Sequence, residues 1–387
     1  MKTNWSFIES QITNHTGHYY NYLRSLLQHT EARAVYVPTS CKIANNLFIK
    51  ALTPWKPKHY GRYGFWAKPA SAFYQLRMSI RRFAEISELL KALDKEENHV
   101  VVWTTVDDFE LVSFLLLNVP ENITLFGIVH MKVQSLYAKL AMKSLQLLNL
   151  IRHSRKALGC NSSAIQSQIK DLGGDHLECA IVPYPFQKPN SINPAEPGKR
   201  FISYLGDART EKGLSLLLAC IPDLTVRAEL FIQCNLPNNT KAKAEQEMIK
   251  KLEAVKQQRN KRIFWQEEVL SDEEYQKAFI SSKILVLPYL SERYEGRVSG
   301  ILGEALINGV PVVVSPGTWL AEQVEMFGGG VVMKEYTNQG LLQAVDTILA
   351  DLENYSGAAT KAGEAFYEIN NAKSLKKVIE KSYETHS

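Results

Sequence analysis

The sequence PYLSERYEGRVSGILGEALINGVPVVVS, residues 288–315, decides the fold of this chain. It follows residues 283–288 (KILVLP), an apolar run that is typical of a buried strand. The pair Ser299–Gly300 predicts the start of a helix, and the motif GVP at 309–311 would end that helix before a second strand, VVV. Strand, turn, helix and strand in this order indicate a βαβ unit with a parallel sheet.

The start of this predicted helix is a candidate anion site. Its free backbone N–H groups and its partial positive charge would point outward over the carboxyl edge of the sheet. Gly300 and Ile301 lie in the first turn, and Glu304 follows one turn later, where a carboxylate could bind ribose hydroxyls. A nucleotide fits this description.

Length and composition favour a two-domain globular protein. The chain has 387 residues, of which 45% are apolar and 22% are charged. No apolar run has the length that crosses a bilayer, and the N-terminus lacks a secretory pattern, so we expect a cytoplasmic protein. The five cysteines are scattered without a Cys-x-x-Cys pair, which argues against a disulfide framework or a zinc site. We therefore expect no metal.

Alternating strand and helix patterns predict an α/β, Rossmann-like domain over residues 1–186. The predicted strands are residues 5–9, 32–38, 100–104, 123–130, 157–160 and 179–186, and the predicted helices are 19–28, 72–93, 138–155 and 163–172. Gly17 lies where the first strand gives way to the first helix, although it can equally be a plain turn glycine. His130 ends a strand at the edge where open α/β sheets bind ligands, so we favour a functional role for it. Asp107 with Glu110 fits a helix capping box better than a metal motif.

Positive charge is concentrated in residues 50–91. The net charge is only +5, but this segment holds nine Lys or Arg residues against two Glu. Its first half interleaves these with Trp and Tyr, and its second half is a predicted amphipathic helix. The apolar side of that helix would carry Phe73, Leu76, Ile80, Phe83, Ile86, Leu89, Leu90 and Leu93. Such a segment could bind an anionic membrane surface, and a solvated helix face beside an ordinary loop is the alternative. No nucleic-acid motif accompanies these charges, so we expect no nucleic-acid partner.

A proline-rich segment, residues 187–199, predicts a linker to a second Rossmann-like domain over residues 200–367. Its predicted strands are residues 201–205, 228–233, 262–266, 284–288 and 312–314, and its predicted helices include 214–219, 242–258 and 271–280. A long helical tail, residues 340–383, closes the chain, and its last part, about 368–387, could pack back on the first domain.

The sequence GDARTEKG, residues 206–213, follows the first strand of the second half directly. Arg209 could bind two phosphate oxygens at once in a bidentate contact, and Lys212 would add a point charge. Taken alone, a surface turn with solvated cations fits these residues equally well. A second anion site on the same predicted sheet, at Ser299–Gly300, favours the phosphate clamp. Gly206 and Gly213 are expected as backbone requirements rather than direct ligands.

The loop Gly-x-x-Arg-x-x-Lys-Gly, the linker after VPYPF and the motif GEALINGVPVVVS together resemble retaining glycosyltransferases of family four, the glycosyl transferases group 1. The resemblance implies the GT-B fold, in which two Rossmann-like domains with parallel sheets face a central cleft. It also implies that Arg209 and Lys212 bind the diphosphate of a nucleotide-sugar donor, with Glu304 on the ribose. Backbone N–H groups near Gly300 and Ile301 would cap the diphosphate.

The same resemblance places Gly17 and His130 against the transferred sugar. It also exposes a departure, because the family commonly carries two glutamates separated by seven residues, with the second at the Glu304 position. This chain has Gly296 at the first position. Either Glu295 fills that role after a one-residue adjustment of the loop, or Arg297 and Ser299 replace it.

We therefore expect metal-independent, retaining transfer of a sugar from a nucleotide-diphosphate sugar to a hydroxyl of a glycan or lipid-linked acceptor. The setting would be bacterial surface polysaccharide or glycolipid synthesis, in the cytoplasm or peripherally on the inner face of the membrane, with no cofactor besides the donor. The expected catalytic residues are Arg209, Lys212, His130 and Glu295. A GT-B nucleotide-sugar epimerase is one alternative, although no convincing set of water-activating groups is evident. A non-catalytic nucleotide-sugar-binding protein is the other, and it would release neither nucleoside diphosphate nor glycosylated acceptor.

Overall fold

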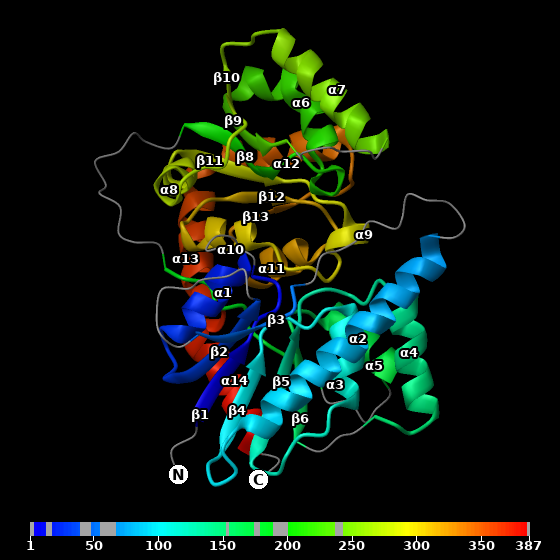
Figure 1. Cartoon of the computed structure of the whole chain (residues 1–387). Helices are drawn as coiled ribbons and strands as arrows, with labels where there is room; N and C mark the ends of the chain where they lie inside the picture. Colours follow the sequence, from blue (N-terminus) through cyan, green and yellow to red (C-terminus); the bar gives the residue numbers. More distant parts are fainter. Residues whose placement is uncertain are drawn as a thin grey trace. The chain divides into compact units, whose positions relative to one another are not determined.

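The computed structural model describes residues 4–12, 18–38, 48–54, 67–151, 155–173, 179–188, 200–236 and 243–384 (Figure 1). They form two compact units, Met1–Pro185 with Asn370–Ser387, and Phe186–Ile369. Each unit contains one parallel sheet with helices packed against it. The predicted fold class, α/β with two Rossmann-like parallel sheets, is confirmed. Gly17 and residues 189–199 of the predicted linker lie outside the described residues.

The first unit has a seven-stranded sheet in the order β3-β2-β1-β4-β5-β6-β7. Its strands are β1 Asn4–Ile8, β2 Ala32–Pro38, β3 Phe48–Leu52, β4 His99–Trp103, β5 Ile123–Val129, β6 Lys156–Cys160 and β7 Cys179–Ile181. Its helices are α1 His18–Leu27, α2 Ala67–Ala92, α3 Asp108–Leu116, α4 Leu136–Leu147, α5 Ser163–Gly173 and α14 Ala372–Glu384. The direction of strand succession reverses between β1 and β4. The carboxyl ends of these two strands are therefore the switch point of this sheet.

Two apolar clusters hold the first unit together. One joins α2, α3, α4 and α5 to the sheet through side chains such as Ile86, Leu111, Met142 and Ile165. The other joins α1 and α14 to the sheet, and Leu375 of α14 belongs to it. The last helix of the chain therefore packs in the same compact unit as the first strand.

The second unit has a six-stranded sheet in the order β10-β9-β8-β11-β12-β13. Its strands are β8 Phe201–Asp207, β9 Glu229–Asn235, β10 Ile263–Gln266, β11 Ser282–Leu287, β12 Val312–Val314 and β13 Gly330–Val332. Its helices are α6 Leu214–Arg227, α7 Lys243–Gln257, α8 Asp272–Ile280, α9 Ser291–Tyr294, α10 Gly300–Ile307, α11 Trp319–Phe327, α12 Asn338–Ala350 and α13 Leu352–Ile369. Here the switch point lies between β8 and β11.

Three predicted helices differ from the structure. The helix predicted over 138–155 ends at Leu147, because Asn149 takes a left-handed conformation with φ 52° just beyond it, a common way to end a helix. The tail predicted as one helical stretch is divided into α12, α13 and α14. The helix predicted over 214–219 continues to Arg227, and Pro222 lies inside it. No helix of the described residues is long and apolar enough to cross a membrane.

The apolar side predicted for α2 is wrong in its first half. Phe73 and Ile80 are exposed, with 70% and 61% of their surface accessible. Met78 and Arg82 pack inward there instead, whereas Ile86 and Leu90 of the predicted side are buried as expected in the second half. A charged residue, Arg82, thus occupies the buried side of this helix.

Candidate functional site

Two loops meet at the switch point of the second unit. Strand β8 leads into residues 206–213, and the neighbouring strand β11 leads into residues 288–299. The backbone N–H of Leu290 donates to the carbonyl of Glu211 over 3.0 Å and ties the loops together. The structure therefore brings together the two halves of the site that the sequence placed about eighty residues apart.

Glycine makes this close approach possible. Gly213 has φ 70°, and a Cβ atom added there would lie only 1.7 Å from the carbonyl oxygen of Pro288. Gly206 has φ 148°, and an added Cβ would lie 3.0 Å from Nζ of Lys212 and 3.6 Å from Cδ1 of Ile301. Both positions need glycine for backbone reasons. The Lys212 side chain thus crosses the end of β8 next to the first turn of α10.

Three cations surround this point, interleaved with two carboxylates. Arg209 lies 3.2 Å from Asp207 and 3.9 Å from Glu211. Lys212 lies 3.8 Å from Asp207, and Arg297 lies 3.2 Å from Glu211. Three positive charges against two negative ones leave the group net positive. Its geometry favours an anion with several oxygens.

The side chains in this group differ in exposure. The Arg209 side chain is 45% exposed and that of Arg297 is 33% exposed, whereas Lys212 is only 14% exposed. Burial lowers the pKa of Lys212, and the neighbouring Asp207 carboxylate opposes that shift. Arg297 also lies over the ring of Tyr294, 5.2 Å from its centroid, which helps to orient it. The two arginines are therefore oriented by neighbours and remain accessible to a ligand.

Helix α10 supplies an open N-terminus beside the cations. Ser299 is its N-cap, and the Ser299 hydroxyl accepts from the backbone N–H of Leu302 over 3.3 Å. Gly300 is exposed, and a Cβ atom added there would meet nothing within 4 Å. The N–H groups of Gly300 and Ile301 belong to the first turn, which has no preceding helical carbonyls to accept from them. There is room for an anion at this helix end.

Glu304 lies one turn into α10 and is half-buried. Tyr275, from α8, lies next to it. Burial raises the pKa of the Tyr275 hydroxyl well above its ordinary value, and the Glu304 carboxylate adds to that shift. Tyr275 could not be predicted from the sequence, because it lies on a separate helix and follows no motif.

Glu295 is the candidate for the first of the family's two glutamates, and it is exposed at the end of α9. Its charge acts on Glu322 of α11, whose pKa is raised by burial first and then by Glu325 and Glu295. Gly296, which occupies the family's usual glutamate position, is buried.

In the first unit, His130 follows β5 as predicted and is half-buried. Its Nε2 lies 2.8 Å from the carbonyl oxygen of Thr104, and its Nδ1 lies 2.5 Å from Oδ1 of Asn161. The ring also meets Tyr22 edge-on, at 5.1 Å between centroids. Burial lowers the pKa of His130 against the effect of both hydrogen-bonding neighbours. A small cavity of about 20 Å³, lined in part by His130 and Asp107, lies beside it.

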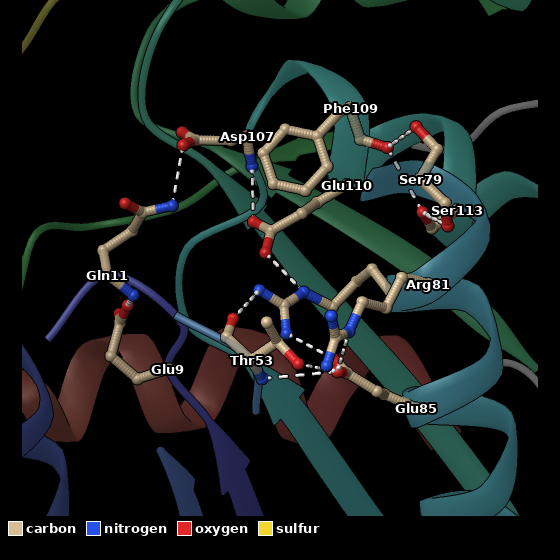
Figure 2. A network of polar contacts seen from close by, with 11 residues as sticks. Glu9, Gln11, Thr53, Ser79, Arg81, Glu85, Asp107, Phe109, Glu110 and Ser113 are labelled. Atoms are coloured by element: carbon tan, nitrogen blue, oxygen red, sulfur yellow. Dashed lines mark hydrogen bonds and ion pairs between the residues drawn. The ribbon is translucent and has the colours of Figure 1, made fainter. Parts of the chain in front are cut away.

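The switch point of the first unit holds a network of buried polar groups (Figure 2). The Glu9 carboxylate accepts from the hydroxyls of Thr104 and Thr105 over 2.8 and 2.7 Å. Gln11 links the network by donating its backbone N–H to Glu9 and its amide to Asp107, each over 2.7 Å. Burial raises the pKa of Glu9 to about 7.

Asp107 and Glu110 form the predicted capping box at the start of α3, which is confirmed. Glu110 also accepts from Nε of Arg82 over 2.9 Å, and both side chains are fully buried. Arg82 further donates to Glu85 over 2.7 Å and to the carbonyl of Thr53 over 3.3 Å. Counting Arg82 among the charges of a membrane-facing surface was therefore wrong, because Glu110 and Glu85 hold its guanidinium inside the unit.

Among the residues described above, no group of three or more His, Cys, Asp or Glu side chains is arranged to hold a metal ion.

The fold and the site define an α/β protein with a net positive switch point in its C-terminal unit, and comparison with known proteins relates that unit to a family. Residues 187–365 match the family model described as "Glycosyl transferases group 1". This C-terminal part of the chain therefore matches the glycosyl transferases group 1, and the resemblance to that group seen in the sequence is confirmed. A search of curated protein sequences found no match.

Solved structures resemble the chain along nearly its whole length. A complex of the Anabaena protein HepE with UDP has 12% identity and a TM-score of 0.69, covering 99% of this chain and 100% of that one. The trehalose-phosphate synthase (UDP-forming) of Burkholderia vietnamiensis has 11% identity and a TM-score of 0.70 at the same coverage. The sucrose-phosphate synthase of Thermosynechococcus elongatus has 12% identity and a TM-score of 0.66, covering 99% of both chains. At these identities the likeness establishes the fold, GT-B.

Proposed function

We propose that this protein is a retaining, metal-independent glycosyltransferase that moves a sugar from a nucleotide-diphosphate sugar to a hydroxyl of a glycan or lipid-linked acceptor. The observation that carries the proposal is the gathering of Arg209, Lys212 and Arg297 over two adjacent strand ends, beside the open N-terminus of α10. A diphosphate matches this arrangement, because it spreads negative charge over several oxygens.

The cations would act on the leaving group. As the bond from the sugar C1 to the diphosphate oxygen breaks, negative charge grows on the diphosphate. Arg209, Lys212 and the N–H groups of Gly300 and Ile301 would stabilise that charge more in the transition state than in the ground state, which is the condition for acceleration. Glu304 would hold the ribose hydroxyls, with Tyr275 fixing its carboxylate.

The acceptor hydroxyl would attack on the face that the diphosphate leaves. A new bond from C1 to the acceptor oxygen forms, and the acceptor proton passes to the leaving phosphate oxygen. Such a step retains the configuration at C1 and requires no strong side-chain base. His130 and Gly17 would contact the transferred sugar, and Glu295 is the remaining carboxylate candidate for the same task.

The structural relatives support a uridine nucleotide as the first donor to test. One of them is a complex with UDP, and another is a UDP-forming synthase. Synthesis of a bacterial surface polysaccharide or glycolipid on the cytoplasmic side is the setting that we propose.

The donor site can be tested by replacing Arg209 with Ala and measuring thermal shifts with UDP, GDP and ADP. We expect one nucleoside diphosphate to stabilise the native protein by about 2.7 kcal/mol at a hundred times its dissociation constant. The Arg209→Ala variant should bind it roughly 10- to 150-fold more weakly, since a charge-assisted contact contributes about 1.5–3 kcal/mol. Arg262→Ala is the matched control, because Arg262 is exposed and precedes β10 at the opposite, amino edge of the same sheet.

Equal affinities in Arg209→Ala and the native protein would show that the clamp is misassigned. Product analysis with the corresponding nucleotide sugar then separates the candidate functions. A transferase gives nucleoside diphosphate and glycosylated acceptor, an epimerase gives an isomerised sugar, and a binding protein gives none of these.

A further inference from the structure

Exposed apolar side chains are concentrated on one part of the first unit. Among the described residues, nine large hydrophobic side chains with at least 39% of their surface accessible lie on α2, on α4 and on the residues flanking α4. They are Phe73, Leu76, Ile80, Met131, Leu136, Leu140, Leu147, Leu148 and Leu150. Leu147 is 86% exposed and Phe73 is 70% exposed. Scattered single residues of this kind are normal, but a group on two neighbouring helices indicates an interaction surface.

Both helices carry two apolar faces. On α4, Ala138 and Met142 are fully buried in the core, while Leu136, Leu140 and Leu147 recur on the opposite side. On α2 the inward residues include Ile86 and Leu90, while Phe73, Leu76 and Ile80 face outward at helical spacing. A surface helix needs only its inner apolar face to fold. The outer faces therefore require a separate explanation.

The two outer faces point to the same side of the unit. Both helices pack their inner faces into one apolar cluster on one face of the sheet, and Figure 1 shows them side by side. The Ser135 hydroxyl at the start of α4 donates a hydrogen bond to the amide oxygen of Gln75 of α2 over 2.5 Å. The Tyr137 hydroxyl donates to the Ser79 hydroxyl over 3.1 Å. These contacts join the two stripes into one surface, which we call the α2–α4 surface.

The charges on the α2–α4 surface are positive. Residues 67–84 and 131–151 contain no Asp or Glu. Arg77, Arg81 and Lys143 are exposed on the same stripes as the apolar side chains, and Lys139 is half-buried beside them. Arg81 is 55% exposed even though it contacts Glu85. The acidic side chains next to these cations are Glu85 beside Arg81 and the half-buried Asp108 near Lys139. Apolar side chains interleaved with mostly basic ones complement a surface that is apolar inside and anionic outside.

We propose that the α2–α4 surface docks on an anionic lipid bilayer. The leucines and Phe73 would enter the boundary between headgroups and acyl chains, while the basic side chains would contact lipid phosphates. This inference uses only contacts of the first unit and does not depend on the donor site. It narrows the sequence prediction for residues 50–91, because it removes Arg82 and adds α4.

Vesicle flotation tests the proposal with the full chain. We expect the protein to float with phosphatidylcholine vesicles that contain phosphatidylglycerol at low salt, and to stay behind with pure phosphatidylcholine or at high salt. Phe73→Ser with Leu147→Ser should lower the bound fraction at least about tenfold, because two apolar anchors are lost. Both residues are largely exposed, so the double variant should fold. The matched control is Val226→Ser with Met326→Ser, which removes two side chains of 77% and 70% exposure from the second unit.

Three results would overturn the proposal. They are binding that does not depend on anionic lipid, equal flotation of both double variants, and no flotation at all. A concentration-dependent dimer that only Phe73→Ser with Leu147→Ser abolishes would assign the surface to a second copy of the chain instead. The nucleoside diphosphate affinity is measured on the same samples. A failed donor site and a failed membrane surface are therefore distinguishable.

Discussion

The two sheets reverse their strand succession in the same way, but their switch points hold opposite kinds of chemistry. Between β1 and β4, the Arg82 guanidinium and the Glu110 carboxylate are fully buried and bonded to each other. Between β8 and β11, the Arg209 and Arg297 side chains keep 45% and 33% of their surface accessible. Buried charges must satisfy one another inside the protein. Half-exposed charges can exchange their contacts for those of a ligand, so exposure separates the structural charges from the candidate binding ones.

The strand ends explain this difference. After β1 and β4 come carboxylates and threonines, and Thr104 and Thr105 bond Glu9 directly across the switch point. After β8 comes Gly206, whose missing side chain leaves space that Lys212 crosses. One switch point is filled by its own side chains, and the other keeps an accessible cationic edge.

Replacing Arg82 should have the largest effect on stability. In Arg82→Met, the Glu110 carboxylate loses its buried guanidinium, and such a loss costs about 3–5 kcal/mol. The neighbouring Arg81→Met is a matched control of the same chemistry. Arg81 is 55% exposed and contacts Glu85 only at the surface, so its loss should cost less than about 1 kcal/mol. Urea unfolding of the two variants measures both losses. Similar losses would contradict the view that this network is structural.

Glu9 should make stability depend on pH. Its pKa in the folded protein, about 7, lies above the ordinary value of 4.5, so the native state holds this proton more tightly than the unfolded chain. The protonated Glu9 contributes on the order of 3 kcal/mol to the free energy of unfolding. This contribution is fully present below about pH 4.5 and is lost as the pH rises through about 7. Burial also raises the pKa of Asp107 and Glu110, which acts in the same direction.

The test compares the free energy of unfolding of the native protein with that of Glu9→Gln at each pH. The contributions of surface carboxylates are the same in both proteins and cancel in the difference. Urea midpoints at about pH 5 and about pH 8 should diverge, with the variant gaining relative stability at the higher pH. A difference that stays constant with pH would show that Glu9 is ionised in the fold.

Much of the candidate site was predictable because its parts follow strand ends in the sequence. Arg209 and Lys212 come directly after β8, and Ser299 caps the helix after β11, so local patterns were sufficient. The ion pairs that complete the two switch points could not be predicted in this way. Arg297 with Glu211 and Arg82 with Glu110 join residues far apart in the chain.

A single sequence carries no signal for such pairs. Periodicity also failed on the first half of α2, because a helix with two apolar faces does not reveal which one is buried. Of the two three-residue strands of the second unit, β12 was predicted from the GVP motif before it, whereas β13 follows no such motif and is too short to show a period.

The smallest effect on stability should come from Lys212, although its burial is nearly complete. Its closest described carboxylate contact is 3.8 Å, to Asp207, and burial lowers its pKa, so the charge gains little from its position in the free protein. Lys212→Met should therefore change the free energy of unfolding by less than about 1 kcal/mol. It should nevertheless weaken nucleoside diphosphate binding roughly 10- to 150-fold. Lys256→Met is the control for the binding measurement. Lys256 is similarly buried, at 17% exposure, but it contacts Glu253 in α7, the helix that follows β9. If Lys212→Met unfolded as readily as Arg82→Met, Lys212 would be a structural charge, and the distinction between the two switch points would fail.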